Sequence, residues 1–286
     1  MGSFFIYGLY FIGAETALNL LSRKNDKVEF VVKTVNFVLI TFVSTLISIS
    51  AAPYMILTNQ RSSLNWLTSR TFICLAEVVL GITVEVENKE LLDQKKPYIF
   101  IGNHQSALDL AYLAAIFPKD AVILAKKAIM YYPLIGWFMV LAGDIFISRG
   151  VKQSTRDMFK KASEILLKKK ATSILPLLAL FFFICVFFFP EGTRGNHPNG
   201  PDLLPFKKGA FILAHEAKVP IVPLVVSDVH NIFNSKLWRF KSGVMRVRVL
   251  PPILSTMDEN CDLDDTIKTT WDLMHKTLLE ISPQRV

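Results

Sequence analysis

Short apolar runs alternate with amphipathic stretches from about residue 84 onward, and this alternation limits the possible folds more than any other feature. Runs with the length and composition of β-strands lie at residues 98–102, 121–125, 144–148, 221–226 and 243–250. Stretches with helical spacing lie at residues 106–116, 152–170, 207–218 and 265–280. Strands that alternate with helices predict an α/β domain, with a mostly parallel, mixed sheet flanked by helices. Ligands of such sheets bind beyond the carboxyl ends of the strands, so polar residues there are candidates for a site.

Two apolar segments precede this domain. Residues 4–21 are mostly apolar, with Glu15 among them, and no basic residue precedes them, which argues against a cleaved secretory signal. Residues 34–57 carry no charge and, at about 1.5 Å per residue of helix, are long enough to cross a bilayer. We therefore predict membrane-anchoring hydrophobic helices over residues 1–70 and the α/β domain over residues 71–286.

The second apolar segment has a mildly polar side, because Thr34, Thr41, Thr45 and Ser48 recur at helical spacing. This stripe can face another helix or the headgroup layer. A helix that spans the membrane and one that lies in its interface therefore both remain open. Hydrophobic residues make up 51% of the chain and the mean hydropathy is +0.38, above the usual range of soluble enzymes, which supports membrane contact.

The chain carries a formal charge of +8 at pH 7, from 32 Lys and Arg against 24 Asp and Glu. This sign suits anionic lipid headgroups or phosphorylated substrates. It would also suit nucleic acid, but the sequence has no basic-aromatic stripe or known binding motif, so we expect no nucleic-acid partner. The three cysteines lie far apart and lack the spacing of metal ligands, which is consistent with a reducing compartment.

The segment "IGNHQSALD", residues 101–109, follows the first predicted strand and places His104 five positions before Asp109. On one continuous helix, residues five apart are rotated by about 140° and do not easily meet. They can meet if the chain turns after the strand and Ser106 caps a helix that carries Asp109 in its first turn. The carboxylate would then hold one imidazole nitrogen and leave the other free as a base. A capped turn with a surface histidine is the alternative that these two residues leave open.

The segment "FPEGTRG", residues 189–195, follows a run of phenylalanines. Gly192 permits a close approach to the backbone, and Arg194 offers a planar guanidinium that suits a phosphate. A local ion pair between Glu191 and Arg194 explains these residues equally well.

Basic residues lie at two further positions where an anion could bind. Arg149 comes just after the predicted strand at residues 144–148, although a solvated loop arginine has the same appearance. Lys207 and Lys208 begin a predicted helix, where the helix dipole already favours anions, although a solvated face is also consistent with them.

Four segments together resemble the four motifs of the glycerolipid acyltransferases, in their order and approximate spacing: "NHQSALD", "GDIFISR", "FPEGTR" and "VPIVPLVV". The chain most resembles the 1-acylglycerol-3-phosphate acyltransferases (lysophosphatidic acid acyltransferases) over residues 98–226, and two N-terminal hydrophobic segments are also typical of that family. Four motifs in order are specific, whereas a histidine and an aspartate alone are not. The resemblance implies a membrane enzyme of phospholipid biosynthesis that converts lysophosphatidic acid into phosphatidic acid.

The resemblance also implies a role for each polar residue. His104 would deprotonate the free sn-2 hydroxyl of the acceptor, Asp109 would support the imidazolium, and the hydroxyl oxygen would attack the thioester of acyl-CoA. No acyl-enzyme is needed, which agrees with the lack of a GxSxG elbow or of a cysteine near His104. Acyl-CoA is thus a co-substrate, and no metal or cofactor is expected. The acceptor phosphate would meet residues of motifs two and three and one lysine near the mouth of the cleft: Arg149, Glu191, Gly192, Thr193, Arg194 and Lys207.

The chain departs from the family pattern just before its third motif. Residues 171–189 are uncharged and stand where family members need only a short strand. A single crossing of the bilayer here would put His104 and Arg194 on opposite faces, and one site could not contain both. We therefore expect a strand at residues 186–189. Residues 171–185 are then an insertion that lies on the membrane or extends the preceding helix, and a retained intron explains them equally well.

The charges around the N-terminal segments do not settle the orientation. Six basic residues lie between and after these segments: Arg23, Lys24, Lys27, Lys33, Arg61 and Arg70. If both segments span the membrane, the positive-inside rule puts the α/β domain on the side away from the cytosol. Because acyl-CoA is mostly cytosolic, we instead expect a site that faces the cytosol, a re-entrant or interfacial N-terminal hairpin, and a location in the endoplasmic reticulum membrane.

Other interpretations remain open. The acceptor could be another glycerophosphate or lysophospholipid, or the protein could be a non-catalytic membrane adaptor whose site the insertion disables. A metal-dependent phosphohydrolase is less well supported, because no further His or Asp cluster supplies ligands. Pro220 and Pro223 of the fourth motif either shape a wall of the acyl site or belong to a buried strand.

Overall fold

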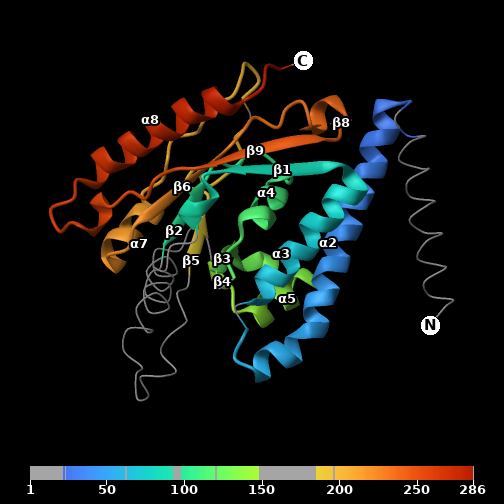
Figure 1. Cartoon of the computed structure of the whole chain (residues 1–286), viewed down its shortest axis with the longest axis horizontal. Helices are drawn as coiled ribbons and strands as arrows, with labels where there is room; N and C mark the ends of the chain where they lie inside the picture. The colour runs from blue at the N-terminus through green and yellow to red at the C-terminus, as the bar shows by residue number, and fades with distance from the viewer. Residues whose placement is uncertain are drawn as a thin grey trace.

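A computed structural model describes residues 22, 24–61, 63–92, 98–119, 121–147, 185–195 and 197–285. Within these residues, one seven-stranded sheet carries helices on both faces, and the long helix α2 (Asp26–Leu57) lies along one side of the molecule (Figure 1). The expected α/β architecture is therefore confirmed.

The main sheet is mixed but mostly parallel. Its strands are β1 (Ile82–Glu87), β2 (Ile99–Gly102), β3 (Ala121–Lys126), β4 (Ile145–Ile147), β5 (Cys185–Phe188), β6 (Ile221–Val226) and β9 (Gly243–Val249). They lie in the order β1-β9-β6-β2-β5-β3-β4, and only β6 and β9 pair in antiparallel fashion. The five strands from β6 to β4 therefore end at one common edge. A small second sheet pairs β7 (Phe233–Asn234) with β8 (Arg239–Phe240).

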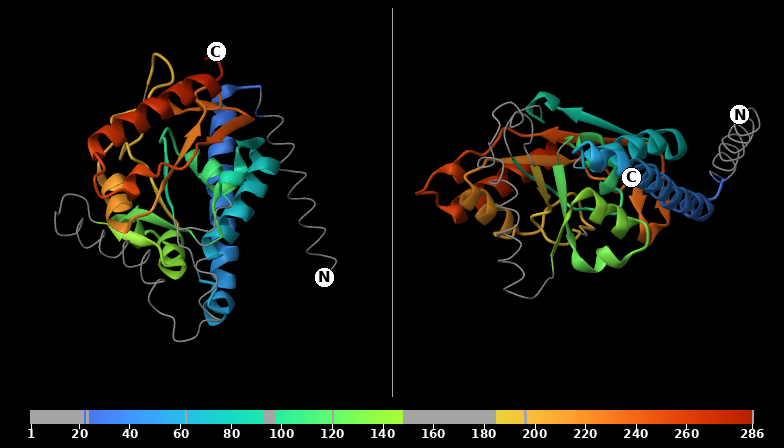
Figure 2. Two further views of the ribbon diagram at one scale, coloured as in Figure 1. Left: turned by 60° about the vertical axis from the view of Figure 1, so that its left-hand side comes forward. Right: turned by 90° about the horizontal axis from the view of Figure 1, so that it is seen from below.

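Helices cover the two faces in two layers. Besides α2, the helices are α3 (Ser63–Leu75), α4 (Asp109–Ile116), α5 (Ile135–Ala142), α7 (Gly209–Ala217) and α8 (Leu263–Ile281), with single turns η1 (Ala76–Leu80), η2 (Lys89–Leu92), η3 (Lys127–Tyr131), η4 (Ser235–Leu237) and η5 (Ser255–Met257). Successive side chains of a strand point to opposite faces. Ile99 and Ile101 of β2 accordingly pack in the cluster with α7 and α8, whereas Phe100 packs in the cluster with α3 and α4. Figure 2 shows the two layers from two further directions.

Most predicted elements are present with shifted ends. The helix expected from residue 106 begins at Asp109, and the strand expected at residues 186–189 forms one residue earlier, at Cys185–Phe188. The longer elements β1, α3 and α5 were not predicted, and neither were the two-residue strands β7 and β8 or the short turns. The predicted helix at residues 152–170 and the insertion up to residue 184 lie outside the described residues.

The fourth motif forms the strand β6. All six of its residues are buried, and Pro223 stands opposite Ile101 of β2 in the parallel register. Of the two interpretations of this motif, the buried strand is therefore the one observed.

The polar stripe of α2 faces another helix. Thr45 and Ser48 are buried, and Thr68 of α3 donates a hydrogen bond to Ser48 Oγ at 2.6 Å. The opposite side of α2 exposes large apolar side chains: Val28, Val31, Val35, Val38, Leu39, Val43, Leu46 and Ile47. Among the described residues, α2 is the one helix long and apolar enough to cross a membrane. Its apolar outer side supports membrane contact.

Two arginines that we counted toward membrane orientation bind the ends of helices instead. Arg61 donates to the carbonyl oxygen of Leu141 at 2.6 Å and to that of Val140, both at the end of α5. Arg70 donates to two carbonyl oxygens at the end of α4, at 3.0 and 3.1 Å. The last carbonyl groups of a helix attract cations. These positions therefore carry little information about topology.

Asp144 is a buried carboxyl group just before β4. Asn65 Nδ2 and the backbone N–H of Ile123 donate to its Oδ1 at 2.8 and 2.9 Å, and its Oδ2 has no hydrogen-bond partner. Burial raises the pKa of Asp144 from 3.8 to about 7, and the two hydrogen bonds and Arg61 oppose that rise. Because the pKa is higher in the folded state, the protonated carboxyl stabilises the fold. That contribution is complete below about pH 4 and is lost as the pH rises through about 7.

Replacing Asp144 by asparagine should remove this pH dependence. Asparagine Oδ1 accepts the same two hydrogen bonds but carries no charge at any pH. We expect the free energy of unfolding of the wild type to fall relative to Asp144→Asn by about 4 kcal/mol between pH 4 and pH 9. Denaturant unfolding at pH 4 and pH 9 measures this difference in the free energy of unfolding. The control is the Asp272→Asn variant, which alters an exposed carboxylate of α8. A difference that does not grow with pH would contradict this account.

Candidate active site

His104 lies in the loop between β2 and α4, at the carboxyl edge of the sheet. The two residues beside it attach this loop to the end of β6. Asn103 Oδ1 accepts from the N–H of Val226 at 2.8 Å, and its Nδ2 donates to the carbonyl oxygen of Val226 at 3.0 Å. Gln105 Nε2 donates to the carbonyl oxygens of Val226 and Ser227, both at 3.0 Å. The backbone that carries the imidazole is thus held on both sides.

The turn expected after the strand brings His104 and Asp109 together. The Nδ1 atom of His104 lies 2.6 Å from Oδ2 of Asp109, which is the first residue of α4. The backbone N–H groups of Gln105 and Ser106 donate to the same Oδ2 at 2.8 and 3.1 Å. Ser106 Oγ in turn accepts from the N–H of Leu108 at 3.0 Å. A loop held by one carboxylate oxygen therefore places the two side chains in contact.

These contacts define the tautomer of the imidazole. Asp109 Oδ2 accepts two backbone N–H groups, so it also acts as the acceptor toward His104, and Nδ1 carries the hydrogen. The Nε2 atom then has the free lone pair, on a side chain that is 22% exposed. Asp109 is only 2% exposed. Burial raises the pKa of Asp109, and its bonds to His104 and to the two amides oppose that rise.

Phe189 supports the ring of His104 from one face. The two ring centroids lie 3.9 Å apart at an angle of 22°, and Phe187 contacts the edge of Phe189 with centroids 5.0 Å apart. Phe189 follows β5, so the third motif reaches the histidine through this ring as well as through its polar residues. The sequence offers no signal for this contact, because Phe189 ends a run of similar phenylalanines.

Glu191 holds the backbone at His104. The N–H of His104 donates to its Oε1 at 2.8 Å, and the N–H of Leu204 donates to its Oε2 at 2.9 Å. Gly195 N–H donates to the carbonyl oxygen of His104 at 2.8 Å, so the loop bonds to both sides of this residue. Glu191 is 3% exposed, and burial raises its pKa. Both oxygens are occupied, and the local ion pair with Arg194 is not observed, so that alternative is wrong.

Lys207 lies against the glycine of the same loop. Gly192 has a φ of +71°, and a Cβ there would stand 2.7 Å from Nζ of Lys207. The positive φ therefore favours glycine, and a side chain there would also displace the end of Lys207. Lys208, in contrast, turns away and pairs with Asp264 of α8 at 2.6 Å. Of the two lysines that begin the predicted helix, only Lys207 reaches the candidate site.

The remaining loop residues are open to solvent. Thr193 and Arg194 are exposed, and neither has a hydrogen bond or ion pair to the described part of the chain. Arg149 lies outside the described residues. The structure therefore gathers His104, Asp109, Glu191, Gly192, Thr193, Arg194 and Lys207 at one edge of the sheet.

The arrangement suits proton transfer beside an anionic ligand. A partly exposed imidazole with a buried carboxylate behind it can accept a proton at Nε2. Exposed cationic side chains on the neighbouring loop can bind a phosphate. Among the side chains that the structure describes, no group of three or more His, Cys, Asp or Glu is placed to hold a metal ion.

Known acyltransferases are similar to this chain in sequence. The family model for acyltransferases matches residues 83–227. A 1-acyl-sn-glycerol-3-phosphate acyltransferase of Saccharomyces cerevisiae is 39% identical over 216 residues, which is 76% of this chain and 66% of the yeast protein. The human 1-acyl-sn-glycerol-3-phosphate acyltransferase beta is 34% identical over 202 residues, which is 71% of this chain and 67% of the human protein.

A solved structure shares the fold. The crystal structure of the 1-acyl-sn-glycerophosphate (LPA) acyltransferase PlsC from Thermotoga maritima superposes with a TM-score of 0.58 at 19% sequence identity, and the match covers 88% of this chain and 99% of the other. The family match spans half of the chain and contains the loops that carry His104, Asp109 and Arg194. The chain belongs to the acyltransferase family.

Proposed function

We propose that this protein transfers the acyl group of acyl-CoA to the sn-2 hydroxyl of 1-acylglycerol-3-phosphate, giving phosphatidic acid and free coenzyme A. The observation that carries the proposal is the contact between His104 Nδ1 and Asp109 Oδ2, 2.6 Å long, beside a loop with exposed Arg194. The printed names of the yeast and human relatives support this acceptor.

The proposed reaction proceeds in one displacement at the thioester. Nε2 of His104 removes the hydroxyl proton as the oxygen attacks the thioester carbonyl. Asp109 stabilises the imidazolium that forms. The departing thiolate of coenzyme A then receives this proton from Nε2. The C–S bond breaks, a C–O ester bond forms, and no net proton is released. Acyl-CoA is thus a co-substrate, and the step requires no cofactor.

The acceptor phosphate meets the loop after β5. In this proposal Arg194 is the main cation, Lys207 lies beside it over Gly192, and Thr193 contributes at the loop tip. Arg149 joins them by resemblance alone. Glu191 contributes to the same site by holding the backbone of His104.

The membrane lies on the side of the exposed apolar face of α2 in this proposal. A lipid acceptor then enters from the bilayer, and acyl-CoA enters from the aqueous side. We place the protein in the endoplasmic reticulum membrane with the site toward the cytosol, where acyl-CoA is available.

An acyl-transfer assay on the purified protein in mixed micelles tests the proposal. The measured quantities are thiol release from acyl-CoA and formation of the acylated lipid, with lysophosphatidic acid, glycerol 3-phosphate and lysophosphatidylcholine as separate acceptors. We expect the highest kcat/KM with lysophosphatidic acid. A preference for another acceptor would replace this substrate, and no transfer to any acceptor would favour the adaptor interpretation.

A further inference from the structure

A cavity of about 310 Å³, lined mostly by polar residues, lies beside the histidine loop, and of its lining residues the account above uses Arg194. One wall is formed by Gln105 and Ser106, which directly follow His104, and by Arg194 of the third motif. A second wall comes from the segment between Asp228 and Lys236, which follows β6 and belongs to none of the four motifs. The cavity is therefore lined by the loop that carries the candidate base, although His104 itself is not among its lining residues.

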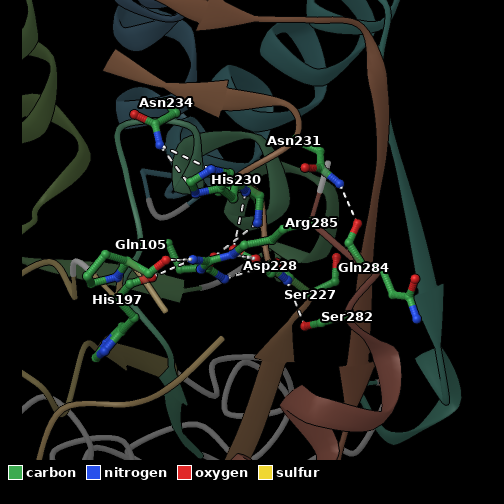
Figure 3. A network of polar contacts seen from close by, with 12 residues as sticks. Gln105, His197, Ser227, Asp228, His230, Asn231, Asn234, Ser282, Gln284 and Arg285 are labelled. Atoms are coloured by element: carbon green, nitrogen blue, oxygen red, sulfur yellow. Dashed lines mark hydrogen bonds and ion pairs between the residues drawn. The ribbon is translucent and has the colours of Figure 1, made fainter. Parts of the chain in front are cut away.

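Hydrogen bonds within the protein hold these walls in place. Arg285 pairs with Asp228 at 2.5 Å and donates to the carbonyl oxygen of His197 at 2.5 Å. Gln105 Oε1 accepts from the N–H of Val229 at 3.1 Å. In Figure 3, Arg285 lies across Asp228, and Gln105 reaches toward them from the other side. The floor of the cavity is thus a connected polar network.

The upper wall is held in the same way. Asn234 Nδ2 contacts His230 Nδ1 at 3.2 Å, and the N–H of Lys236 donates to Asn234 Oδ1 at 3.0 Å. Figure 3 shows His230 between Asn234 and the pair formed by Asp228 and Arg285. This turn fixes the backbone that carries Lys236. Such walls are preorganised, since their polar groups do not need a ligand to order them.

The charges around the cavity are unequal. Asp228 is neutralised by Arg285, and Asp202, which is half exposed, lies 3.1 Å from His275 and 3.9 Å from His197. In the described ranges, neither Arg194 nor Lys236 has a carboxylate partner. Two cationic side chains that line the same cavity are therefore available to an anion.

We propose that this cavity holds the phosphate monoester of the acceptor and that Lys236 determines headgroup specificity, as a second cation besides Arg194. This inference rests on the proposed function. A phosphate monoester carries close to two negative charges at pH 7, which matches two unpaired cations. The cationic end of a choline or ethanolamine headgroup would meet the same two side chains and be repelled.

The position of the cavity favours the acceptor over the donor as the source of the phosphate. In 1-acylglycerol-3-phosphate, the phosphate is attached to the carbon next to the one that bears the reacting hydroxyl. In acyl-CoA, the whole pantetheine arm separates the thioester from the phosphates. The cavity is lined by the two residues that follow His104 on the same loop, which favours the phosphate that lies closer to the reacting group.

Replacing Lys236 by glutamine should raise the KM for lysophosphatidic acid about tenfold, the loss expected for one charge-assisted contact to phosphate. The KM for acyl-CoA should not change. The ratio of kcat/KM for lysophosphatidic acid to that for lysophosphatidylcholine should fall by at least the same factor. Lys236→Arg should restore most of both values, and Lys268→Gln, which alters an exposed lysine of α8 away from the cavity, is the matched control.

A binding measurement separates this inference from the proposed function. Calorimetric titration of the His104→Ala protein with mixed micelles that contain lysophosphatidic acid reports headgroup binding without turnover. Weaker binding when Lys236→Gln is added supports the inference even if acyl transfer is not detected. If the wild type is active and Lys236→Gln leaves the KM for lysophosphatidic acid unchanged, the inference is overturned and the proposed function stands. A rise in the KM for acyl-CoA alone would assign the cavity to the donor and would also overturn it.

Discussion

The His104→Ala protein should lose acyl transfer by a factor of about 10³ to 10⁴ in kcat, the full contribution of a positioned general base. The imidazole is the one group in the described site that combines a free ring nitrogen, partial exposure and a carboxylate partner. Without it, the hydroxyl must lose its proton to water while the thioester is attacked. Coupled detection of thiol release and phosphatidic acid in mixed micelles measures the loss.

The fold should survive this substitution. Oδ2 of Asp109 keeps the hydrogen bonds from Gln105 and Ser106, and Glu191 keeps its bond to the backbone N–H of residue 104. Thermal unfolding of the variant checks this. The matched control is His215→Gln in α7, where Nδ1 lies 3.2 Å from the carbonyl oxygen of Thr256. Retention of more than a tenth of the wild-type kcat in His104→Ala would show that His104 is not the base.

The elements that the sequence predicted well are those whose pattern is local. β6 was predicted from a continuous apolar run, which reflects burial on both faces of the strand. β9 was predicted from an alternating run, which reflects burial on one face. The strand β1 was missed although "ITVEVE" alternates in the same way as the run that predicted β9, its parallel partner in the sheet. Helix ends were the least accurate. The chain turns through residues 106–108 before α4 begins, because Asp109 binds the amides of that turn.

The candidate site was predicted in its residues but not in their contacts. The motif indicates that a glutamate follows a strand, but it does not indicate that both carboxylate oxygens accept from backbone N–H groups. The role of Glu191 therefore changes from a phosphate-site residue to one that holds the backbone of His104. Phe189 and Gln105 contact or flank the histidine without a sequence signal, because a phenylalanine in an apolar run and a glutamine in a loop are common. The segment that carries Lys236 lies outside all four motifs. It lies beside the loop of His104 only because β6 and β2 are neighbours in the sheet.

Asp109→Asn should lower kcat by about 10² to 10⁴ while keeping the geometry of the loop. Three N–H donors, from His104, Gln105 and Ser106, converge on Oδ2 of Asp109, so the asparagine must place its oxygen at that position. Its Nδ2 then takes the position of Oδ1, which has no hydrogen-bond partner. The hydrogen then stays on Nδ1 of His104, and Nε2 still faces the substrate. What disappears is the negative charge that stabilises the imidazolium in a buried site, where charge interactions are strong.

The comparison with Asp109→Ala separates charge from geometry. Alanine removes the acceptor of two backbone N–H groups, so it should also lower the free energy of unfolding by about 1–3 kcal/mol, and asparagine should lower it less. If both variants lose activity but only alanine loses stability, the carboxylate acts on the imidazolium through its charge. If asparagine keeps most of the wild-type kcat, Asp109 only holds the turn. In that case His104 works without charge support, and the pairing at 2.6 Å is structural.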